Sequence, residues 1–163
     1  MKETDFISKK ILTAPQIVKQ VAQWRVLTKK IAFTNGVFDI LHQGHIFSLS
    51  QAAKVADYLI VGVNSDSSVK KLKGENRPVN NQDSRAIVLA SLIVVDAVVV
   101  FDEETPLELI KTIMPDVLVK GGDYIISQVA GAKEVIANGG RVVINPIIEG
   151  FSTTEIINRF KNN

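Results

Sequence analysis

Both histidines of this 163-residue chain lie within four positions of each other, in the segment Thr34-Asn35-Gly36-Val37-Phe38-Asp39-Ile40-Leu41-His42-Gln43-Gly44-His45. Gly36 and Gly44 permit sharp turns and the close approach of a ligand, because no side chain covers the backbone there. A helix is expected to begin at this point, and a helix N-terminus offers free N–H donors and a partial positive charge that favour phosphate. Two imidazoles beside it add donors that can stabilise charge developing on a phosphoryl group. The pattern therefore predicts a site for a nucleoside triphosphate.

Other interpretations of these residues stay open. Two histidines three positions apart could ligate zinc, although the chain has no Cys and no third His, so carboxylates would have to complete the site. The histidines could instead be part-buried core or capping residues, and the glycines could serve turns alone. The joint pattern of strand, glycine turn, His-x-Gly-His and helix favours the phosphate site.

The elements that must position these residues are indicated by short β-branched runs alternating with amphipathic stretches, a pattern typical of βαβ units. The expected strands are Ile31 to Asn35, Tyr58 to Asn64, Ala97 to Phe101, Val117 to Lys120 and Arg141 to Asn145. The expected helices are Ala14 to Trp24, His45 to Ala56, Asp83 to Ile93, Pro106 to Ile113, Ala130 to Ala137 and Thr153 to Phe160. We therefore expect an α/β fold with a Rossmann-like, doubly wound, five-stranded parallel sheet. It would form a single domain over residues 1–163, with a helical extension at 1–25 and the catalytic core at 26–163.

The stretch from Ser65 to Asn80 is expected to be a long polar connection after the second strand. It contains a local positive cluster made of Lys70, Lys71, Lys73 and Arg77. A solvated surface loop would also explain such a charge run. In open α/β sheets, however, ligands bind beyond the carboxyl ends of the strands, and this connection leaves one of those ends. Its position favours a role in binding phosphate.

Two later motifs are also candidates for ligand binding. Lys120-Gly121-Gly122-Asp123 leaves the fourth expected strand, where two glycines admit a ligand and the lysine and aspartate offer one charge of each sign. Ser152-Thr153-Thr154 opens the last expected helix, where hydroxyls and free N–H groups could bind a phosphate or ribose. Ser152 or Thr153 could equally do no more than cap that helix.

Composition excludes several classes of protein. Nineteen Lys+Arg against seventeen Asp+Glu give 19 − 17 = +2, too balanced for a protein that coats nucleic acid or an anionic membrane. Without cysteine there is no disulfide framework, which suits the cytoplasm. The polar start and the longest apolar run, interrupted by Ser91 and Asp96, predict neither a secretory signal nor a membrane span. We expect a soluble cytoplasmic protein with small-molecule substrates.

The chain resembles the nucleotidyltransferases with a His-x-Gly-His signature. More closely, TNGVFDILHQGH together with VNSD at Val63 to Asp66, KGGDY at Lys120 to Tyr124 and EGFSTTEII at Glu149 to Ile157 looks like the adenylyltransferase half of the bifunctional ADP-heptose synthases. The resemblance runs from about Trp24 to Phe160. It implies an enzyme that transfers AMP from ATP to D-glycero-β-D-manno-heptose 1-phosphate, giving ADP-heptose for surface glycans such as the lipopolysaccharide core.

The resemblance also assigns roles to residues. His42, His45, Lys71, Lys73 and Arg85 are the implied catalytic residues, although Arg85 taken alone could be a surface charge. The implied binding residues, which share the turn and the strand ends, are Thr34, Asn35, Gly36, Val37, Phe38, Asp39, Gly44, Asn64, Lys120, Gly121, Asp123, Ser152, Thr153 and Thr154. Mg²⁺ is expected to arrive with ATP rather than on dedicated protein ligands, and Asp39 could orient either the metal or a neighbouring loop. A homodimer is the family-like expectation.

Rival functions share this fold. A glycerol-3-phosphate cytidylyltransferase would typically carry Arg-Thr before Glu-Gly-Ile-Ser-Thr-Thr, whereas Ile147 and Ile148 stand there in this chain. An FAD synthetase and a non-catalytic nucleotide sensor are further alternatives. Pantetheine-phosphate adenylyltransferases usually have Thr-x-Gly-His, so His42 argues against them.

Overall fold

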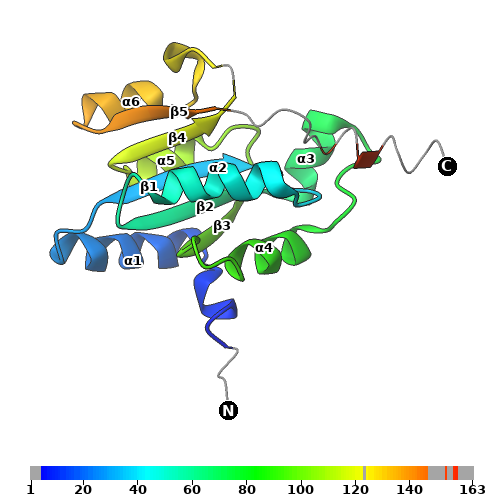
Figure 1. Ribbon diagram of the computed structural model, residues 1–163, viewed down its shortest axis with the longest axis horizontal. Coiled ribbons are helices and arrows are strands. Elements are labelled where there is room, and N and C mark those ends of the chain that lie inside the picture. The colour runs from blue at the N-terminus through cyan, green and yellow to red at the C-terminus, as the bar shows by residue number, and fades with distance from the viewer. Residues whose placement is uncertain (1–4, 123, 147–152, 154–155, 158–163) are drawn as a thin grey trace.

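The computed structural model describes residues 5–122, 124–146, 153, 156 and 157. The strands are β1 (Ile31–Gly36), β2 (Tyr58–Asn64), β3 (Ala97–Phe101), β4 (Val117–Gly121) and β5 (Arg141–Asn145). They form one sheet in the order β3-β2-β1-β4-β5, and every neighbouring pair is parallel (Figure 1). The expected doubly wound parallel sheet is confirmed, and its strands differ from the expected ranges only at Gly36 and Gly121, each one residue longer.

The helices are α1 (Ala14–Val26), α2 (Gln43–Ala53), α3 (Asp66–Lys73), α4 (Gln82–Ala90), α5 (Leu107–Ile113) and α6 (Ala132–Ala137), with short 3-10 turns at Ser8–Lys10 and Ile126–Gln128. Five of the six expected helices are present, with ends shifted by at most three residues. The sixth expected helix, Thr153 to Phe160, lies mostly outside the described residues; Thr153, Ile156 and Ile157 are helical.

The expectation of a polar loop from Ser65 to Asn80 was wrong for its first half, which forms α3. Ser65 caps this helix, because its Oγ accepts the backbone N–H of Ser68. Asp66 lies in the first turn and three lysines in the last, which suits the helix dipole, and Gly74 ends the helix at φ 92°. Val69 is the only buried apolar residue of α3, so the helix depends more on these local signals at its ends than on apolar packing.

Helices cover both faces of the sheet, as alternation along β1 requires. Ile31 and Phe33 pack into one cluster with α1, α5 and α6, whereas Ala32 packs into the other with α2 and α4. Each cluster consists mainly of buried aliphatic side chains, so the strand ends are held on a rigid platform. Among the described residues, no helix is long and apolar enough to cross a membrane.

Candidate active site

From β1 the chain first adds strands on one side of the sheet, β2 and β3, and then on the other, β4 and β5. The topological switch point therefore lies between β1 and β4, where a ligand site is expected in an open α/β sheet. The carboxyl ends of these strands open into a cavity of about 410 Å³. Its walls come from the glycine turn, α2, the α3–α4 connection and the end of β4. The lining residues are Thr34, Asn35, Gly36, Val37, Phe38, Asp39, His45, Ser48, Leu49, Lys73, Arg77, Lys120, Gly121, Tyr124 and Thr153.

The turn after β1 depends on the missing side chain of Gly36 and on the unusual backbone conformation of Phe38. A Cβ on Gly36 would lie 3.0 Å from Cε2 of Phe38, so the ring would have to shift to make room for it. Phe38 itself has φ 49°, a left-handed conformation that is uncommon for a bulky side chain. Its ring meets the His45 ring edge to face, with centroids 5.3 Å apart. The turn therefore brings backbone, Phe38 and His45 together at the floor of the cavity.

The two histidines have different positions at the start of α2. His42 is the N-cap residue of the helix and His45 follows one turn later. Their rings stack with centroids 3.8 Å apart, and the backbone N–H of His42 donates to Nδ1 of His45 at 3.4 Å. His45 is among the residues that line the cavity, and His42 stacks against its ring.

Burial of His45, reinforced by the charge of His42, lowers the pKa of His45 to about 4. Burial also lowers the pKa of His42. His45 is therefore neutral at physiological pH. Because its Nδ1 accepts a hydrogen bond, its proton lies on Nε2, which makes that atom a donor. His45 can therefore donate a hydrogen bond to an anionic group in the cavity, a role that suits phosphate binding better than proton abstraction does.

Cations reach the cavity from two sides of β1. Lys73 and Arg77 come from the segment that joins β2 to β3, and Lys120 comes from the end of β4. Lys120 Nζ lies 3.4 Å from Oδ1 of Asn35 and 5.4 Å from the centre of the Tyr124 ring. Burial lowers the pKa of Lys120. The site can therefore hold several negative charges along a path that crosses the end of β1.

Lys71 and Lys73 were both expected at the phosphates, but the structure brings only Lys73 into the cavity wall. Both are exposed residues near the end of α3. Arg77, four residues beyond Lys73, lines the cavity with it. The local positive cluster thus contributes Lys73 and Arg77 rather than Lys71 and Lys73.

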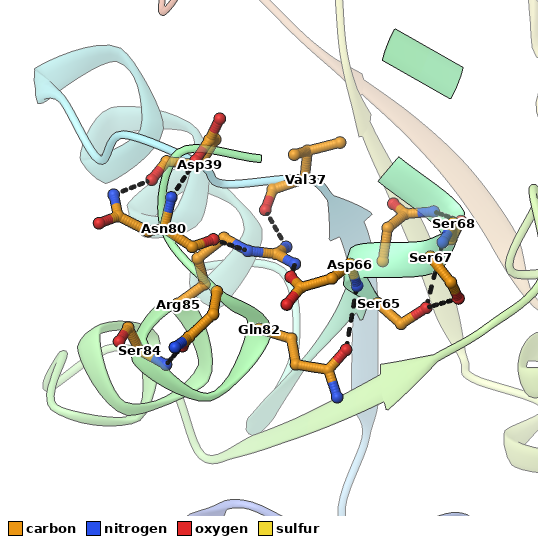
Figure 2. Close-up of polar contacts among 12 residues, drawn as sticks. Val37, Asp39, Ser65, Asp66, Ser67, Ser68, Asn80, Gln82, Ser84 and Arg85 are labelled. Atoms are coloured by element: carbon orange, nitrogen blue, oxygen red, sulfur yellow. Dashed lines mark hydrogen bonds and ion pairs between the residues drawn. The ribbon is translucent and has the colours of Figure 1, made fainter. Parts of the chain in front are cut away.

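The resemblance implies that Arg85 is a catalytic residue, and that role stays a prediction. Arg85 is 2% exposed, and it does not line this cavity. Its guanidinium donates to Asn80 O, Val37 O and Asp66 Oδ1, as Figure 2 shows. Because these three acceptors come from segments that meet only in the folded protein, the fold holds the guanidinium in the interior.

The other predicted binding residues fall into three groups. The cavity walls include Thr34, Asn35, Gly36, Val37, Phe38, Asp39, Lys120, Gly121 and Thr153. Gly44 and Asn64 lie outside them; the Asn64 Nδ2 donates to Ser68 Oγ and so supports the first turn of α3. Asp123, Ser152 and Thr154 lie outside the described residues.

Sequence reasoning named Arg77 only as part of the local positive cluster, and it assigned no role to Ser48, Leu49 and Tyr124, which also line the cavity. Ser48 was detectable, because position i+3 from His45 shares its helix face. Tyr124 ends the KGGDY motif already singled out. No group of three or more His, Cys, Asp or Glu that could hold a metal occurs among the described residues, and Mg²⁺ arriving with ATP stays a prediction.

Comparisons with known proteins place the chain in a family. Residues 33–159 match the model of a family described as cytidylyltransferase-like. The chain is 54% identical over 150 residues to the bifunctional protein HldE of Koribacter versatilis (strain Ellin345), covering 92% of this chain and 31% of that protein. It is 52% identical over 151 residues to the bifunctional protein HldE of Shigella flexneri serotype 5b (strain 8401), covering 93% of this chain and 32% of that protein. The chain thus spans about a third of the length of these relatives.

Solved structures share the fold. A lipopolysaccharide core biosynthesis protein from Thermoplasma volcanium GSS1 superposes with a TM-score of 0.59 at 28% identity, over 74% of this chain and 97% of that one. The pantoate-beta-alanine ligase of Francisella tularensis superposes with a TM-score of 0.60 at 16% identity, over 94% of this chain and 78% of that one. The second likeness concerns the fold alone.

Proposed function

The chain belongs to the cytidylyltransferase-like family, and on that premise we propose that it transfers AMP from ATP to D-glycero-β-D-manno-heptose 1-phosphate, giving ADP-heptose and pyrophosphate. The identity of 54% to a bifunctional protein HldE over 150 residues supports this activity. So does the resemblance of four motifs to the adenylyltransferase half of ADP-heptose synthases.

One observation carries the proposal. A neutral histidine donor, His45, faces the same cavity as Lys73, Arg77 and Lys120, at the point where β1 and β4 diverge. Cations on both sides of β1 fit a reaction that brings a triphosphate and a second phosphate together. Asp39 also lines the cavity and pairs with Arg77, so three cations against this one carboxylate leave a net positive charge that suits phosphate groups.

The proposed reaction is an in-line displacement at phosphorus. An oxygen of the sugar 1-phosphate attacks the α-phosphorus of ATP, a new O–P bond forms, and the bond to the bridging oxygen of the β-phosphate breaks. Pyrophosphate leaves with the electron pair. A phosphate monoester is already ionised, so no general base is required, and the protein mainly aligns the reactants and neutralises charge.

Each residue has a defined task in this scheme. The Nε2–H of His45 stabilises the α-phosphoryl group, and the stacked His42 holds the His45 ring in place. Lys73 and Arg77 neutralise phosphate charge on the β2 side, and Lys120 does so on the β4 side. Gly36 and Gly121 let the substrates lie against the backbone.

Further parts of the proposal concern the setting of the enzyme. Mg²⁺ enters as part of the nucleotide substrate, where it neutralises phosphate charge. The enzyme works in the cytoplasm, where ATP is available, and forms a homodimer; light scattering at micromolar concentration tests the dimer. The product would serve surface glycans such as the lipopolysaccharide core.

A release assay for pyrophosphate tests the activity directly. ATP, CTP, GTP and UTP are each combined with heptose 1-phosphate, glycerol 3-phosphate and FMN, with the His45→Ala variant as a control for contaminating activity. ATP with heptose 1-phosphate should give the fastest release, and mass spectrometry should detect ADP-heptose.

Preference for CTP with glycerol 3-phosphate would replace the proposal with a cytidylyltransferase, and preference for FMN would replace it with an FAD synthetase. Binding of ATP without turnover on any acceptor would indicate a nucleotide sensor.

A further inference from the structure

Asp39 follows the glycine turn, and its carboxylate is committed to the protein. The side chain is 1% exposed, and it accepts hydrogen bonds from Arg77 Nε at 2.7 Å, Val79 N at 2.8 Å and Asn80 N at 2.9 Å. The carbonyl of Asp39 accepts a further bond from Asn80 Nδ2 at 2.6 Å. Both carboxylate oxygens are thus used to hold residues 77–80. This favours orientation of the loop over binding of a metal.

Arg85 holds the same connection from the opposite side. Its Nε donates to the carbonyl of Asn80 at 3.0 Å, its Nη1 to Val37 O at 2.7 Å and its Nη2 to Asp66 Oδ1 at 2.8 Å. In one side chain, Arg85 therefore joins the glycine turn, the α3–α4 connection and the first turn of α3. Figure 2 shows Asn80 lying between Asp39 and Arg85.

Asn80 is the residue that both charged groups share. Its N–H and Nδ2 donate to Asp39, and its carbonyl accepts from Arg85. Moving Asn80 along the glycine turn would break its hydrogen bonds to the buried Asp39 or to the buried Arg85. Because the loss of a partner is costly for a buried charged group, the connection has little freedom to move.

From this geometry we propose that Asp39 and Arg85 are positioning residues that clamp residues 74–81 against the glycine turn and so place Lys73 and Arg77 in the cavity. In its catalytic part this inference rests on the proposed function. Neither residue needs to contact substrate. Lys73 directly precedes this stretch and Arg77 lies within it, so the positions of both depend on how the stretch is held.

The electrostatics of Asp39 fit this task. Burial alone would raise the pKa of Asp39, but hydrogen bonds from the Asn80 and Val79 backbone and from Arg77 outweigh it and hold the pKa below its ordinary value. The carboxylate therefore stays charged throughout the physiological pH range and keeps its hydrogen bonds to Arg77, Val79 and Asn80.

The first experiment measures the clamp without any substrate. Hydrogen exchange of residues 74–81 is compared between wild type, Asp39→Asn and Asn80→Ala. Asp39→Asn replaces an acceptor by a donor facing Val79 N–H and Asn80 N–H. We expect exchange in this segment to rise about tenfold or more, with a smaller rise for Asn80→Ala, which removes a single side-chain bond.

A matched control is Asp116→Asn. Asp116 also accepts a backbone N–H, from Ile31, and pairs with a cation, Lys30, but its partners lie at the amino ends of the strands. Its variant should leave exchange in residues 74–81 and ATP affinity at wild-type values. Unchanged exchange of this segment in both Asp39→Asn and Asn80→Ala would overturn the clamp.

The second experiment is a double-mutant cycle with Lys73→Ala, read as ATP affinity by calorimetry and as kcat/KM. Asp39→Asn alone should lower kcat/KM by about 10- to 100-fold, because misplaced charges lose most of their effect. In that background, Lys73→Ala should cost only a few-fold more. Equal losses from Lys73→Ala in both backgrounds would mean that Asp39 does not position Lys73. If wild type binds ATP but transfers nothing, the proposed function fails, while exchange and the cycle in ATP affinity still decide the clamp.

Discussion

The imidazole rings of His42 and His45 stack 3.8 Å apart at the start of α2, and the backbone N–H of His42 donates to Nδ1 of His45. In the proposed reaction, His45 stabilises the α-phosphoryl group through its Nε2–H, and His42 holds that ring in place. Three cations, Lys73, Arg77 and Lys120, line the same cavity as His45.

His45→Ala should lower kcat by about 10²- to 10³-fold while ATP affinity changes little, because a preorganised donor acts mainly on charge that develops in the transition state. His42→Ala should also lower kcat, since the His45 ring loses its stacking partner. Single-turnover rates, calorimetry and melting temperatures on both variants check this. Gln43→Ala, an exposed neighbour on the same helix, is the control. Rate losses that only track unfolding would contradict the assignment.

Proton NMR of the two histidines should show both titrating below the ordinary value of 6.5, with the pKa of His45 near 4. A His42→Asn variant assigns the signals. Bound ATP should raise both pKa values, because phosphate charge favours the imidazolium form. A pKa near 6.5 for His45 in the free protein would mean that its ring is solvated.

The same shift makes stability depend on pH. The unfolded chain protonates His45 near pH 6.5, whereas the folded chain resists protonation until about pH 4, so the unfolded state binds more protons between these values. The free energy of unfolding should therefore fall as the pH is lowered through this window. Urea titrations at several pH values measure the slope, which should be shallower in His45→Gln.

Lys73→Ala should lower kcat/KM by about tenfold or more, and Lys71→Ala should leave it near wild type, because only Lys73 lines the cavity. Both residues are exposed, so each variant should keep its stability within about 0.5 kcal/mol. The two lysines lie on the same helix and serve as controls for each other. Equal losses in both variants would show that general positive charge matters, rather than position.

Lys120→Met keeps most of the side-chain length and removes the charge. Loss of a charged hydrogen bond costs about 1.5–3 kcal/mol, which corresponds to a 10- to 100-fold loss in ATP affinity or in KM for the sugar phosphate. Calorimetry with ATP and kinetics with varied sugar phosphate determine which substrate Lys120 serves. Lys133→Met, an exposed lysine on α6, should have no effect. If neither measurement changes for Lys120→Met, Lys120 has no role at the site.

Local patterns in the sequence were sufficient for the sheet. Each strand carries a short apolar run, mostly buried except in the edge strand β5, so the sequence pattern located β1 to β5 to within one residue. The glycine turn and the His-x-Gly-His motif were also readable, because they depend on residues close together in the chain. α3 was missed although its Ser65 cap and the stop at Gly74 are local signals, since its polar composition suggested a loop.

Only the tertiary structure decided which charged residues face the cavity. Arginine is usually exposed, so nothing local indicates that Arg85 is buried; its acceptors on Val37 and Asp66 lie 48 and 19 residues away. Lys71 and Lys73 are alike in sequence, and only their positions relative to the cavity separate them. The sequence specifies which residue types are present and in what order. Which of them lie close enough to act together is decided only when β1, β4 and the α3–α4 connection meet in the fold.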